Sequence, residues 1–275
     1  MLNRSNIKRF IPPIVFSLIR SLNYQDNSIY SGNFKTWNDA MENSVGYSAH
    51  SILEKCKNSI LKIKNNEAVF ERDSVLFNEP QYPWPLIACL QHIALENRNT
   101  LKVIDFGGSL GSTYFQSKIF LEHLDQLSWT VVEQENFVEC GLKNFVDNHL
   151  NFEYTITDTL NNTGPVNCMI LSGVLQCLEE PFKLIDEVLN TNIKYLLLDR
   201  TSFITGEPRL MVLKINDIGQ KASYPLWFFN EEELLVAITS KYDLLTEFDS
   251  TADGTFKNAE NETMYWKGYL FKIKN

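Results

Sequence analysis

A glycine-rich segment near the middle of the chain holds the residue types and spacing with the clearest chemical meaning. It reads Asp105-Phe106-Gly107-Gly108-Ser109-Leu110-Gly111-Ser112 and ends a short apolar run at 101–106. Glycines at such a place let the backbone approach a ligand closely, and a helix that begins there offers unpaired N–H groups. The segment therefore predicts a ligand-binding loop between a strand and a helix, where open parallel sheets bind their ligands.

Two nucleotide-binding patterns do not fit this loop. Counted from Gly107, the dinucleotide fingerprint G-x-G-x-x-G needs glycine where the chain has Ser109 and Ser112, and no G-K-[ST] follows for a phosphate-binding P-loop. The loop is more similar to the D/E-x-G-x-G-x-G segment of class I S-adenosylmethionine-dependent methyltransferases. Asp105, Gly107 and Gly111 match that segment, and Ser109 departs from its middle glycine.

Polar residues also follow the next two predicted strands. Glu133 and Gln134 end the second strand, where an acid can accept hydrogen bonds from both ribose hydroxyls. An NAD site uses an acid similarly, so Glu133 supports adenosine binding more firmly than it selects the cofactor. Asp158 and Thr159 come just after the third strand, where the methyltransferase resemblance implies contact with adenine.

The segment after the fourth predicted strand, 172–181, resembles the S-x-V-L-x-H-hydrophobic-x-D-P segment of many small-molecule methyltransferases. Cys177 stands in place of the usual His, which argues against a base at this position. We interpret Cys177 as structural, because a free cysteine is commonly buried and inert. The predicted cofactor-binding residues are Asp105, Gly107, Gly108, Ser109, Gly111, Glu133, Gln134, Asp158, Thr159, Ser172, Gly173 and Leu175.

The elements that must position these residues alternate between strand and helix. Strands are expected at 101–106, 129–132, 152–157, 166–171 and 195–198, and helices at 113–127, 137–148 and 182–189. This alternation predicts a parallel sheet with helical crossovers. A helix at 231–239 and strands at 242–248 and 268–273 follow, too close together for a crossover, so these strands should be antiparallel. The expected fold is α/β and Rossmann-like, with a seven-stranded, mostly parallel sheet and a C-terminal antiparallel hairpin.

The remaining chain divides into two further parts. Residues 24–98 are predicted to form a helical N-terminal cap on a core at 99–275. Residues 1–23 form a basic amphipathic leader: Arg4, Lys8, Arg9 and Arg20 lie in 1–22 without any acid. Its apolar run is far shorter than the roughly 20 residues needed to cross a bilayer. The leader either packs on the protein's own core or rests on an anionic membrane surface, a peripheral contact at the inner face of the membrane.

Composition excludes several classes of protein. The 275 residues include 25 Lys and Arg against 34 Asp and Glu, a net charge of −9, which disfavours a nucleic-acid partner. The 5 cysteines include no C-x-x-C pair, and the 4 histidines lack ligand spacing, so no metal site is predicted. A cytoplasmic location is the expectation, since no export signal is recognisable.

Several further segments carry a more specific resemblance, over about residues 30–273. The chain resembles an uncharacterised family of class I S-adenosylmethionine-dependent methyltransferases found among bacterial surface-polysaccharide genes. The segments concerned are 30–37, 46–48, 70–77, 82–86, 105–114, 129–134 and 222–229. The resemblance implies S-adenosylmethionine as cofactor and a small-molecule or lipid-linked glycan acceptor.

Acceptor contacts are expected from the cap and from the segment that follows the fifth strand. The candidates are Tyr47, Tyr82, Trp84, Gln176, Arg200, Tyr224 and Trp227. Aromatic faces can stabilise a cationic sulfonium, although large aromatics are mostly buried for packing. His50, Arg200 and Tyr224 are the candidates for catalysis, and a base is needed only if the acceptor must lose its proton early.

Two other functions fit parts of this pattern. One is an NAD-linked sugar oxidoreductase or epimerase, which the failed fingerprint and the closing hairpin disfavour. The other is a non-catalytic, membrane-associated scaffold that keeps the fold, because fold alone does not decide function. Binding of the methyl donor separates these alternatives from a methyltransferase.

Overall fold

The computed structural model describes residues 30–44, 49–217, 220–258 and 260–274. The proposed leader, its membrane contact and Tyr47 lie outside these residues. Within the described part of the chain, no helix is both long and apolar enough to span a membrane.

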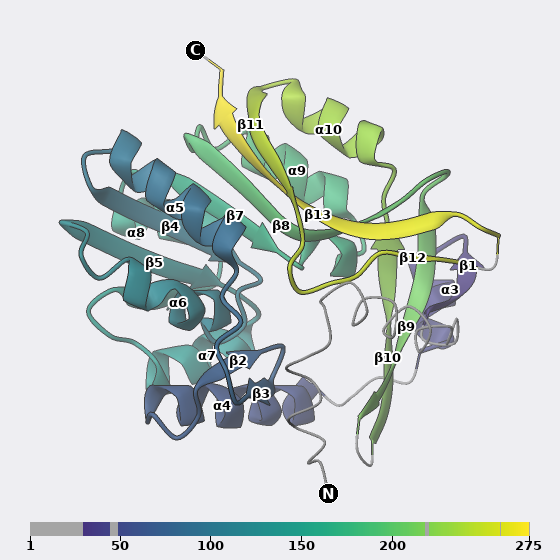
Figure 1. Cartoon of the computed structure of the whole chain (residues 1–275), viewed down its shortest axis with the longest axis horizontal. Coiled ribbons are helices and arrows are strands. Elements are labelled where there is room, and N and C mark those ends of the chain that lie inside the picture. The colour runs from purple at the N-terminus through teal and green to yellow at the C-terminus, as the bar shows by residue number, and fades with distance from the viewer. Residues whose placement is uncertain (1–29, 45–48, 218–219, 259, 275) are drawn as a thin grey trace, which may run out of the picture.

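A twisted central sheet forms the body of the protein (Figure 1). Its strands are β4 (Thr100–Phe106), β5 (Gln126–Val132), β6 (Leu150–Glu153), β7 (Cys168–Ser172), β8 (Tyr195–Ile204), β11 (Tyr242–Asp249) and β13 (Thr263–Ile273). They lie in the order β11-β13-β8-β7-β4-β5-β6, and short β12 (Phe256–Lys257) pairs with β13. Strands β4 to β8 pair in parallel, whereas β13 is antiparallel to both β8 and β11. The Rossmann-like sheet with an antiparallel C-terminal hairpin, expected from the sequence, is confirmed.

The strand order reverses at β4. From β4 the chain runs outward through β5 and β6, then returns to add β7 and β8 on the other side of β4. The connections after β4 and β7 therefore diverge, which leaves a crevice at the carboxyl ends of these two strands. Ligands of open α/β sheets bind in such a crevice.

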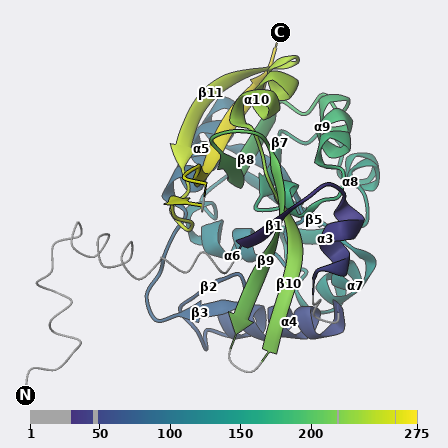
Figure 2. The same cartoon turned by 90° about the vertical axis from the view of Figure 1, so that its right-hand side faces the viewer.

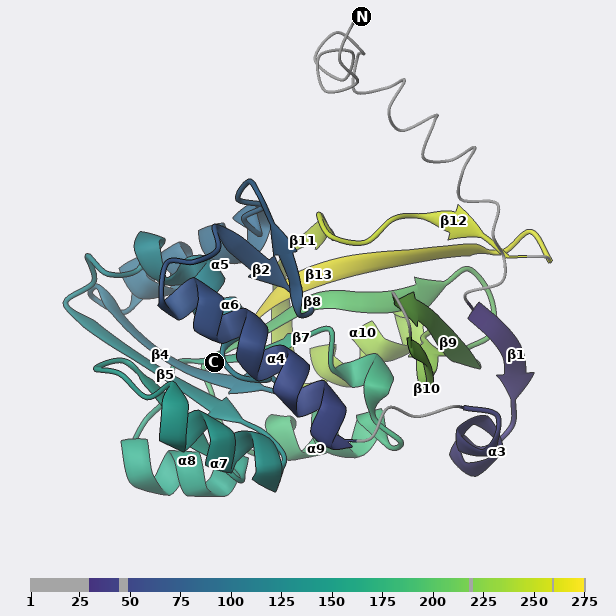
Figure 3. The same cartoon turned by 90° about the horizontal axis from the view of Figure 1, so that it is seen from below.

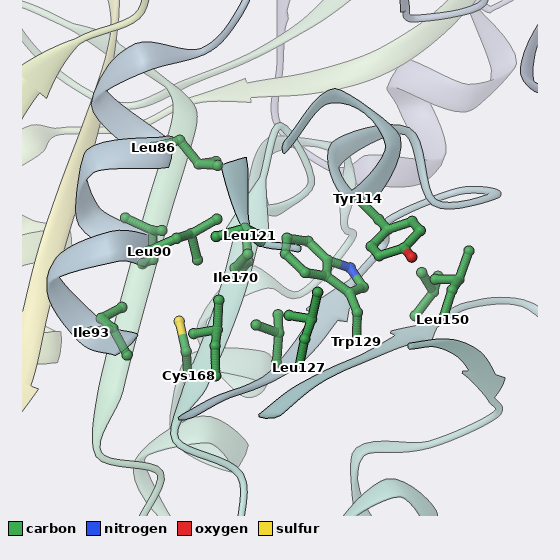
Figure 4. Close-up of a cluster of buried hydrophobic side chains, with 14 of the residues drawn as sticks. Leu86, Leu90, Ile93, Tyr114, Leu121, Leu127, Trp129, Leu150, Cys168 and Ile170 are labelled. Atoms are coloured by element: carbon green, nitrogen blue, oxygen red, sulfur yellow. The ribbon is translucent and has the colours of Figure 1, made fainter. Parts of the chain in front are cut away.

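Helices cover both faces of the sheet. Helices α4 (Ala49–Lys64), α5 (Trp84–Glu96), α6 (Ser112–Ser117) and α7 (Glu135–Asn144) pack on one face, and α8 (Ile156–Thr163), α9 (Pro181–Leu189) and α10 (Glu231–Thr239) pack on the other. Trp129 is fully buried in the first of these two cores, beside Tyr114 and Leu127 (Figure 4). Both sheet faces are thus withdrawn from water, which explains why the parallel strands read as nearly continuous apolar runs.

Several element boundaries differ from the sequence expectation, and three of them have a clear local cause. The helix expected at 113–127 is only α6 followed by the 3-10 helix η1 (Lys118–Phe120), because the chain turns at 121–125 and enters β5 early. Strand β6 ends at Glu153, since the Thr155 hydroxyl caps α8 by accepting the Asp158 amide at 3.0 Å. Strand β8 extends to Ile204 because β13 pairs with it along this length.

A second, smaller sheet lies beside the central one (Figure 2). It consists of β1 (Tyr30–Phe34), β9 (Arg209–Asp217) and β10 (Gln220–Phe228), all antiparallel in the order β1-β9-β10. Helix α3 (Trp37–Glu42) packs on one of its faces through Ala40. Strand β1 comes from the region predicted to be a helical cap, so this region contributes a strand to a sheet whose other strands follow β8.

The same region contains a β-hairpin next to α4, formed by β2 (Phe70–Arg72) and β3 (Val75–Phe77) (Figure 3). Arg72 pairs with Val75, which leaves the two-residue turn Asp73-Ser74. The turn residues have φ angles of 53° and 63°. Two positive φ values define the type I′ turn that suits the twist of a hairpin. The expectation that 24–98 is helical therefore needs correction at β1, β2 and β3.

Candidate functional site

The glycine-rich loop begins where β4 ends. Gly107, Ser109 and Gly111 have φ angles of 71°, 55° and 89°, so three residues adopt the left-handed conformation. A Cβ atom on Gly107 would lie 2.3 Å from a methyl carbon of Val174. The chain can thus turn sharply between β4 and α6 only because this position lacks a side chain.

Asp105 lies beneath this loop and is 1% exposed. One carboxylate oxygen accepts the indole N–H of Trp129 at 3.1 Å, and the other has no partner within the described residues. Burial raises the pKa of Asp105 to about 7, although the Trp129 hydrogen bond lowers it. A Cβ atom on Gly108 would lie 2.5 Å from this carboxyl group. The loop backbone therefore lies directly against a buried acid.

Glu133 follows β5, next to the glycine loop. Its carboxylate accepts the Gln134 amide at 2.7 Å. Burial raises the pKa of Glu133, while hydrogen bonds from the backbone of Gln134 and Ser109 lower it. The interaction with Ser109 places the acid within reach of the loop, as the ribose assignment requires. Gln134 itself is exposed at the start of α7.

Asp158 and Thr159 lie in the first turn of α8 rather than in a loop. The Asp158 carboxylate accepts the Thr155 hydroxyl at 2.7 Å as part of the helix cap. Thr159 is fully buried, and its hydroxyl donates to the Thr155 carbonyl at 3.0 Å. Leu175 is likewise buried, in the core on the α9 face of the sheet. Of these predicted cofactor residues, only Asp158 keeps a partly exposed side chain.

The carboxyl ends of β7 and β8 are joined by polar contacts. The Ser172 hydroxyl donates to Asp199 at 2.7 Å, and the Gly173 amide donates to the Asp199 carbonyl at 2.9 Å. Asp199 is 6% exposed, and burial raises its pKa against the lowering effect of Ser172 and Arg200. Gly173 has a φ of 66°, so the chain turns away directly after Ser172.

A pocket of about 100 Å³ opens above these strand ends. Four parts of the chain line it: the carboxyl ends of β4, β7 and β8 with the glycine loop, helix α6, the β2–β3 hairpin with the segment after it, and the loop at 250–252. The lining residues include Arg72, Asp73, Gln81, Pro83, Gly107, Gly108, Ser109, Ser112, Ser172, Asp199, Arg200 and Ser250. The pocket therefore occupies the crevice where the strand order reverses, and it contains four of the predicted cofactor-binding residues and Arg200.

Arg200 closes one side of this pocket. Its Nη1 and Nη2 donate to the two Asp73 oxygens at 2.9 and 2.8 Å, and its Nε donates to Asp253 at 2.9 Å. Both carboxylates raise the pKa of Arg200 well above its ordinary value, against the effect of burial. With two carboxylates on one guanidinium, Arg200 joins the hairpin turn to the loop at 250–253. It is a structural clamp and not a free cation for an anionic acceptor.

The hairpin is also fixed to the helix that follows the glycine loop. Glu71 is 4% exposed and accepts hydrogen bonds from the Ser112 hydroxyl and the Ser74 amide. Gln116 donates to the Glu71 carbonyl at 2.8 Å. These contacts hold Asp73 over the pocket. Sequence reasoning missed Asp73, Asp253 and Glu71, although the alternating segment 70–77 around Asp73-Ser74 carries a hairpin signal.

Tyr224 and Cys177 lie near the same clamp. The Tyr224 side chain is 36% exposed, and its pKa is raised by burial and by the nearby groups Cys177, Tyr30 and Asp73. Cys177 is exposed, which corrects the expectation of a buried thiol. Its thiol donates to the Gly173 carbonyl at 3.7 Å.

The other acceptor candidates have different surroundings. Trp227 stacks on Trp37 with ring centroids 6.5 Å apart, and its indole N–H donates to the Leu178 carbonyl at 3.1 Å. Tyr82 and Trp84 belong to an aromatic cluster with Phe120, with centroid distances of 4.9 to 5.2 Å. These three candidates pack against other aromatic rings, whereas the neighbouring Gln81 and Pro83 line the pocket.

The last two candidates are His50 and Gln176. His50 belongs to the first turn of α4, and nothing about its side chain is described. Gln176 is 4% exposed; its amide nitrogen donates to the Arg200 carbonyl at 2.9 Å, and its amide oxygen has no partner within the described residues. No set of three or more His, Cys, Asp or Glu side chains suited to a metal ion occurs in the described ranges.

The fold is Rossmann-like, and its polar pocket lies where the strand order reverses. No family model matches the chain. No curated protein matches it either. Among solved structures, the chain is similar to the N-terminal domain of EvdMO1 with S-adenosylhomocysteine and D-fucose, at 11% identity and a TM-score of 0.46, covering 83% of this chain and 98% of that one.

Two further structures have a similar fold. One is an S-adenosylmethionine-dependent methyltransferase from Clostridium acetobutylicum, at 9% identity and a TM-score of 0.45, covering 69% of this chain and 91% of that one. The other is the glycopeptide N-methyltransferase MtfA with S-adenosylmethionine, at 10% identity and a TM-score of 0.41, covering 68% and 94%. At these identities the similarity concerns the arrangement of the chain alone.

Proposed function

We propose that the protein is an S-adenosylmethionine-dependent methyltransferase. The observation that carries the proposal is the polar pocket at the carboxyl ends of β4, β7 and β8, built on a left-handed glycine loop. When bound, S-adenosylmethionine supplies a methyl group on a cationic sulfonium. The identity of the acceptor is a separate part of the proposal.

The charges around the pocket favour a cationic ligand over a dinucleotide. Asp73 and Asp199 line the pocket together with Arg72 and Arg200, and the one charge of Arg200 is shared between Asp73 and Asp253. The diphosphate of NAD would meet these acids at close range, and like charges repel. The ammonium and sulfonium groups of S-adenosylmethionine would be attracted. This difference argues for the methyl donor and against the NAD-linked alternative.

The chain's own residues would bind and orient the donor. Glu133 is placed to accept the ribose hydroxyls, and the amides of the glycine loop can contact the polar end of the ligand. Arg72, whose guanidinium donates to Gln81 at 3.1 Å at the pocket wall, is available for the donor carboxylate. The pocket volume of about 100 Å³ suits the amino-acid end of the donor, so the nucleoside would extend past Ser109 toward Glu133.

The acceptor part of the proposal is a small molecule or a glycan-type compound in surface-polysaccharide biosynthesis. It is supported by the resemblance of segments 30–37, 70–77 and 222–229 to a family found among such genes. In the structure these segments form β1, the β2–β3 hairpin and the end of β10. Of the three, the β2–β3 hairpin contributes residues that line the pocket, Arg72 and Asp73.

Thermal unfolding with S-adenosylhomocysteine, with NAD or without ligand tests the proposal. A ligand at about 100 times its Kd should stabilise the fold by about 2.7 kcal/mol. We expect a shift with S-adenosylhomocysteine only, lost in Glu133→Ala and kept in Glu139→Ala, where Glu139 is an exposed residue of α7. A shift with NAD alone supports the oxidoreductase, and no shift with either supports the scaffold.

A further inference from the structure

A second hollow lies at the amino ends of the central strands. This amino-end groove has a volume of about 520 Å³ and is open to solvent. It is formed by the turn after α5, the first residues of β4 and β5, and the segments that lead into β7 and β8. Strand β4 has 7 residues, so the groove lies about 20 Å from the donor pocket at the other end of this strand. The groove is therefore not part of the donor site.

Three basic side chains from separate segments line the amino-end groove. Arg98 belongs to the turn between α5 and β4, Lys102 to β4 itself, and Lys194 comes directly before β8. None of the three forms an ion pair with a carboxylate in the part of the chain that the structure describes. Lys194 donates to the neutral side chain of Asn97 at 3.1 Å. The groove thus contains three positive charges without a paired negative charge.

The one acid that lines the groove does not change this balance. Among the lining residues, all of them in the described ranges, the carboxylate is that of Glu96. Lys272 donates to this carboxylate at 3.3 Å, so Glu96 is already paired with a cation outside the lining. The chain as a whole has a net charge of −9. The positive charge of the groove is therefore opposite in sign to that of the whole protein.

Asn167 holds two of the cationic segments in fixed positions at the floor of the groove. Its side-chain oxygen accepts the Lys102 amide at 2.7 Å, and its own amide donates to the Lys102 carbonyl at 3.1 Å. Its carbonyl accepts the amide of Tyr195, the residue after Lys194, at 3.0 Å. Because β7 lies between β4 and β8, these two backbones are about 10 Å apart. Two flexible lysine side chains at this separation can reach one anionic group from both sides.

Arg98 occupies a backbone position that disfavours its type of side chain. Arg98 and Asn99 have φ angles of 55° and 53°, and the Thr100 amide donates to the Asn97 carbonyl at 3.2 Å. Two positive φ values within this hydrogen bond define a type I′ turn, which suits Gly, Asn and Asp. No hydrogen bond or ion pair of the Arg98 side chain within the described residues offsets this strain. Strain of this kind is typical of residues that contact a ligand.

From this arrangement we infer that the amino-end groove binds a phosphate-bearing ligand. A guanidinium binds phosphate oxygens in pairs, and an ammonium binds them as a compact charge. Three unpaired cations match a group with about two or three negative charges, as in a diphosphate. The inference goes beyond the proposed function and does not depend on it, because the groove and the donor pocket lie at opposite ends of the sheet.

The size of the groove and its neutral lining narrow the ligand further. A volume of about 520 Å³ exceeds what a single phosphate ion fills and lies in the range of sites for small organic molecules. The amide side chains of Gln126 and Asn192 line the groove beside the cations and can bind hydroxyl groups next to the phosphates. Three cations are too few to follow a nucleic-acid backbone. A phosphorylated small molecule and a phospholipid headgroup share the chemistry that remains.

Calorimetric titration of the full chain with inorganic pyrophosphate tests the inference. We expect one binding event per chain, which weakens as salt is added because exposed charges are screened. The double variant Lys102→Gln/Lys194→Gln should bind pyrophosphate at least about tenfold more weakly. The matched control is Lys62→Gln/Lys143→Gln, which removes the same charge from exposed positions on α4 and α7 outside the groove. This control should bind pyrophosphate as tightly as wild type.

No binding of pyrophosphate by the wild type, or an equal loss of affinity in the two double variants, would overturn the inference. Thermal unfolding without any anion checks the fold. Lys102→Gln/Lys194→Gln should unfold no earlier than wild type, because the substitutions remove like charges that repel each other. S-adenosylhomocysteine affinity should be the same in both double variants and in wild type. Failure of S-adenosylhomocysteine to bind the wild type would therefore contradict the proposed function and leave this inference standing.

Co-sedimentation with vesicles then identifies the source of the phosphate. The vesicles contain either phosphatidylglycerol with phosphatidylcholine or phosphatidylcholine alone. Binding to the anionic vesicles that is lost in Lys102→Gln/Lys194→Gln, but kept in the control variant, assigns the groove to a lipid headgroup. Pyrophosphate binding combined with vesicle binding that does not differ between the two variants assigns it to a soluble phosphorylated molecule.

Discussion

The two ends of the central sheet differ in charge and in size. At the carboxyl ends of the strands, a pocket of about 100 Å³ is lined by two acids, Asp73 and Asp199, and two arginines, Arg72 and Arg200. At the amino ends, an open groove of about 520 Å³ is lined by Arg98, Lys102, Lys194 and Glu96. The larger hollow thus lies at the amino end, where basic residues outnumber acids.

The difference follows from how the strands are connected. At the carboxyl end, the connections after β4 and β7 diverge, and the glycine loop exposes backbone amides in the gap. At the amino end, Asn167 bridges two strands: its amide donates to the Thr100 carbonyl at 3.0 Å, and its oxygen accepts the Lys102 amide at 2.7 Å. The side-chain amide of Asn167 therefore connects β4 to the start of β7 by hydrogen bonds. We therefore expect substitutions at the two ends to have different consequences.

The largest effect should come from Asp105→Asn. The pKa of Asp105 is raised to about 7 in the folded state, so folded protein keeps a proton that unfolded protein releases near pH 4. The favourable contribution of protonated Asp105 to the free energy of unfolding is therefore complete at low pH and is lost as the pH rises through 7. Relative to wild type, Asp105→Asn should gain on the order of 4 kcal/mol of stability between pH 4 and pH 8.

Urea unfolding at both pH values measures this gain, and Asp186→Asn, at an exposed position on α9, is the control. If the free energies of unfolding of wild type and Asp105→Asn change in parallel with pH, folded Asp105 does not keep its proton, and this prediction is wrong.

Gly108→Ala should come next. Its Cβ atom would lie 2.5 Å from the buried Asp105 carboxyl, which cannot move aside easily. Overpacking of this kind costs about 1–3 kcal/mol, so S-adenosylhomocysteine affinity should fall about 10- to 100-fold. Calorimetric titration measures the loss. Gly254→Ala, where a Cβ atom would have no neighbour within 4 Å, should bind normally; equal affinities for the two variants would contradict the role of the loop.

Arg200→Lys should have a smaller effect. Lysine keeps the charge but loses the planar fork that binds Asp73 and Asp253 together, which should cost about 1–2 kcal/mol of unfolding free energy. Arg209→Lys is a matched variant outside the pocket, because Arg209 pairs with Glu260 and Glu262, both at 2.6 Å. Both variants should lose stability in denaturant titrations, but only Arg200→Lys should also weaken donor binding. If Arg200→Lys and Arg209→Lys bind the donor equally well, Arg200 and its two carboxylates are not part of the donor site.

The smallest effect is expected at the other end of the sheet. Lys102→Ala changes a basic residue of the amino-end groove that contacts nothing in the donor pocket. Its effect on stability should stay within about 0.5 kcal/mol, and S-adenosylhomocysteine affinity should not change. A clear loss of donor affinity in Lys102→Ala would mean that the two ends of the sheet are coupled. That result would contradict this prediction.

The carboxyl end could be predicted from sequence because its signals are local. The apolar run of β4, the glycines after it and Glu133 after β5 lie within about one strand-helix-strand unit. Each signal depends only on neighbouring residues, so the crossover topology was enough to bring them to one edge of the sheet.

The contacts of Arg200 and the small sheet could not be predicted in the same way. Asp73, Arg200 and Asp253 meet across separations of 127 and 53 residues, and no periodicity connects them. Strand β1 was missed because its pairing partner β9 follows it by about 180 residues. Tyr224 and Trp227 were equivalent in the sequence, and only the pairing of β9 with β10 shows that they lie on opposite faces.

The position of β13 has a consequence for the order of assembly. This strand is the last one in the described chain, yet it lies between β8 and β11 inside the sheet. During synthesis, β8 and β11 emerge earlier and have no partner between them until β13 follows. Until then β8 presents an unpaired, apolar edge, the kind of surface that promotes aggregation. A chain cut short by its last dozen residues would therefore keep its glycine loop and the β7–β8 pairing, but β8 would lose the strand that pairs with it on both sides of Arg200.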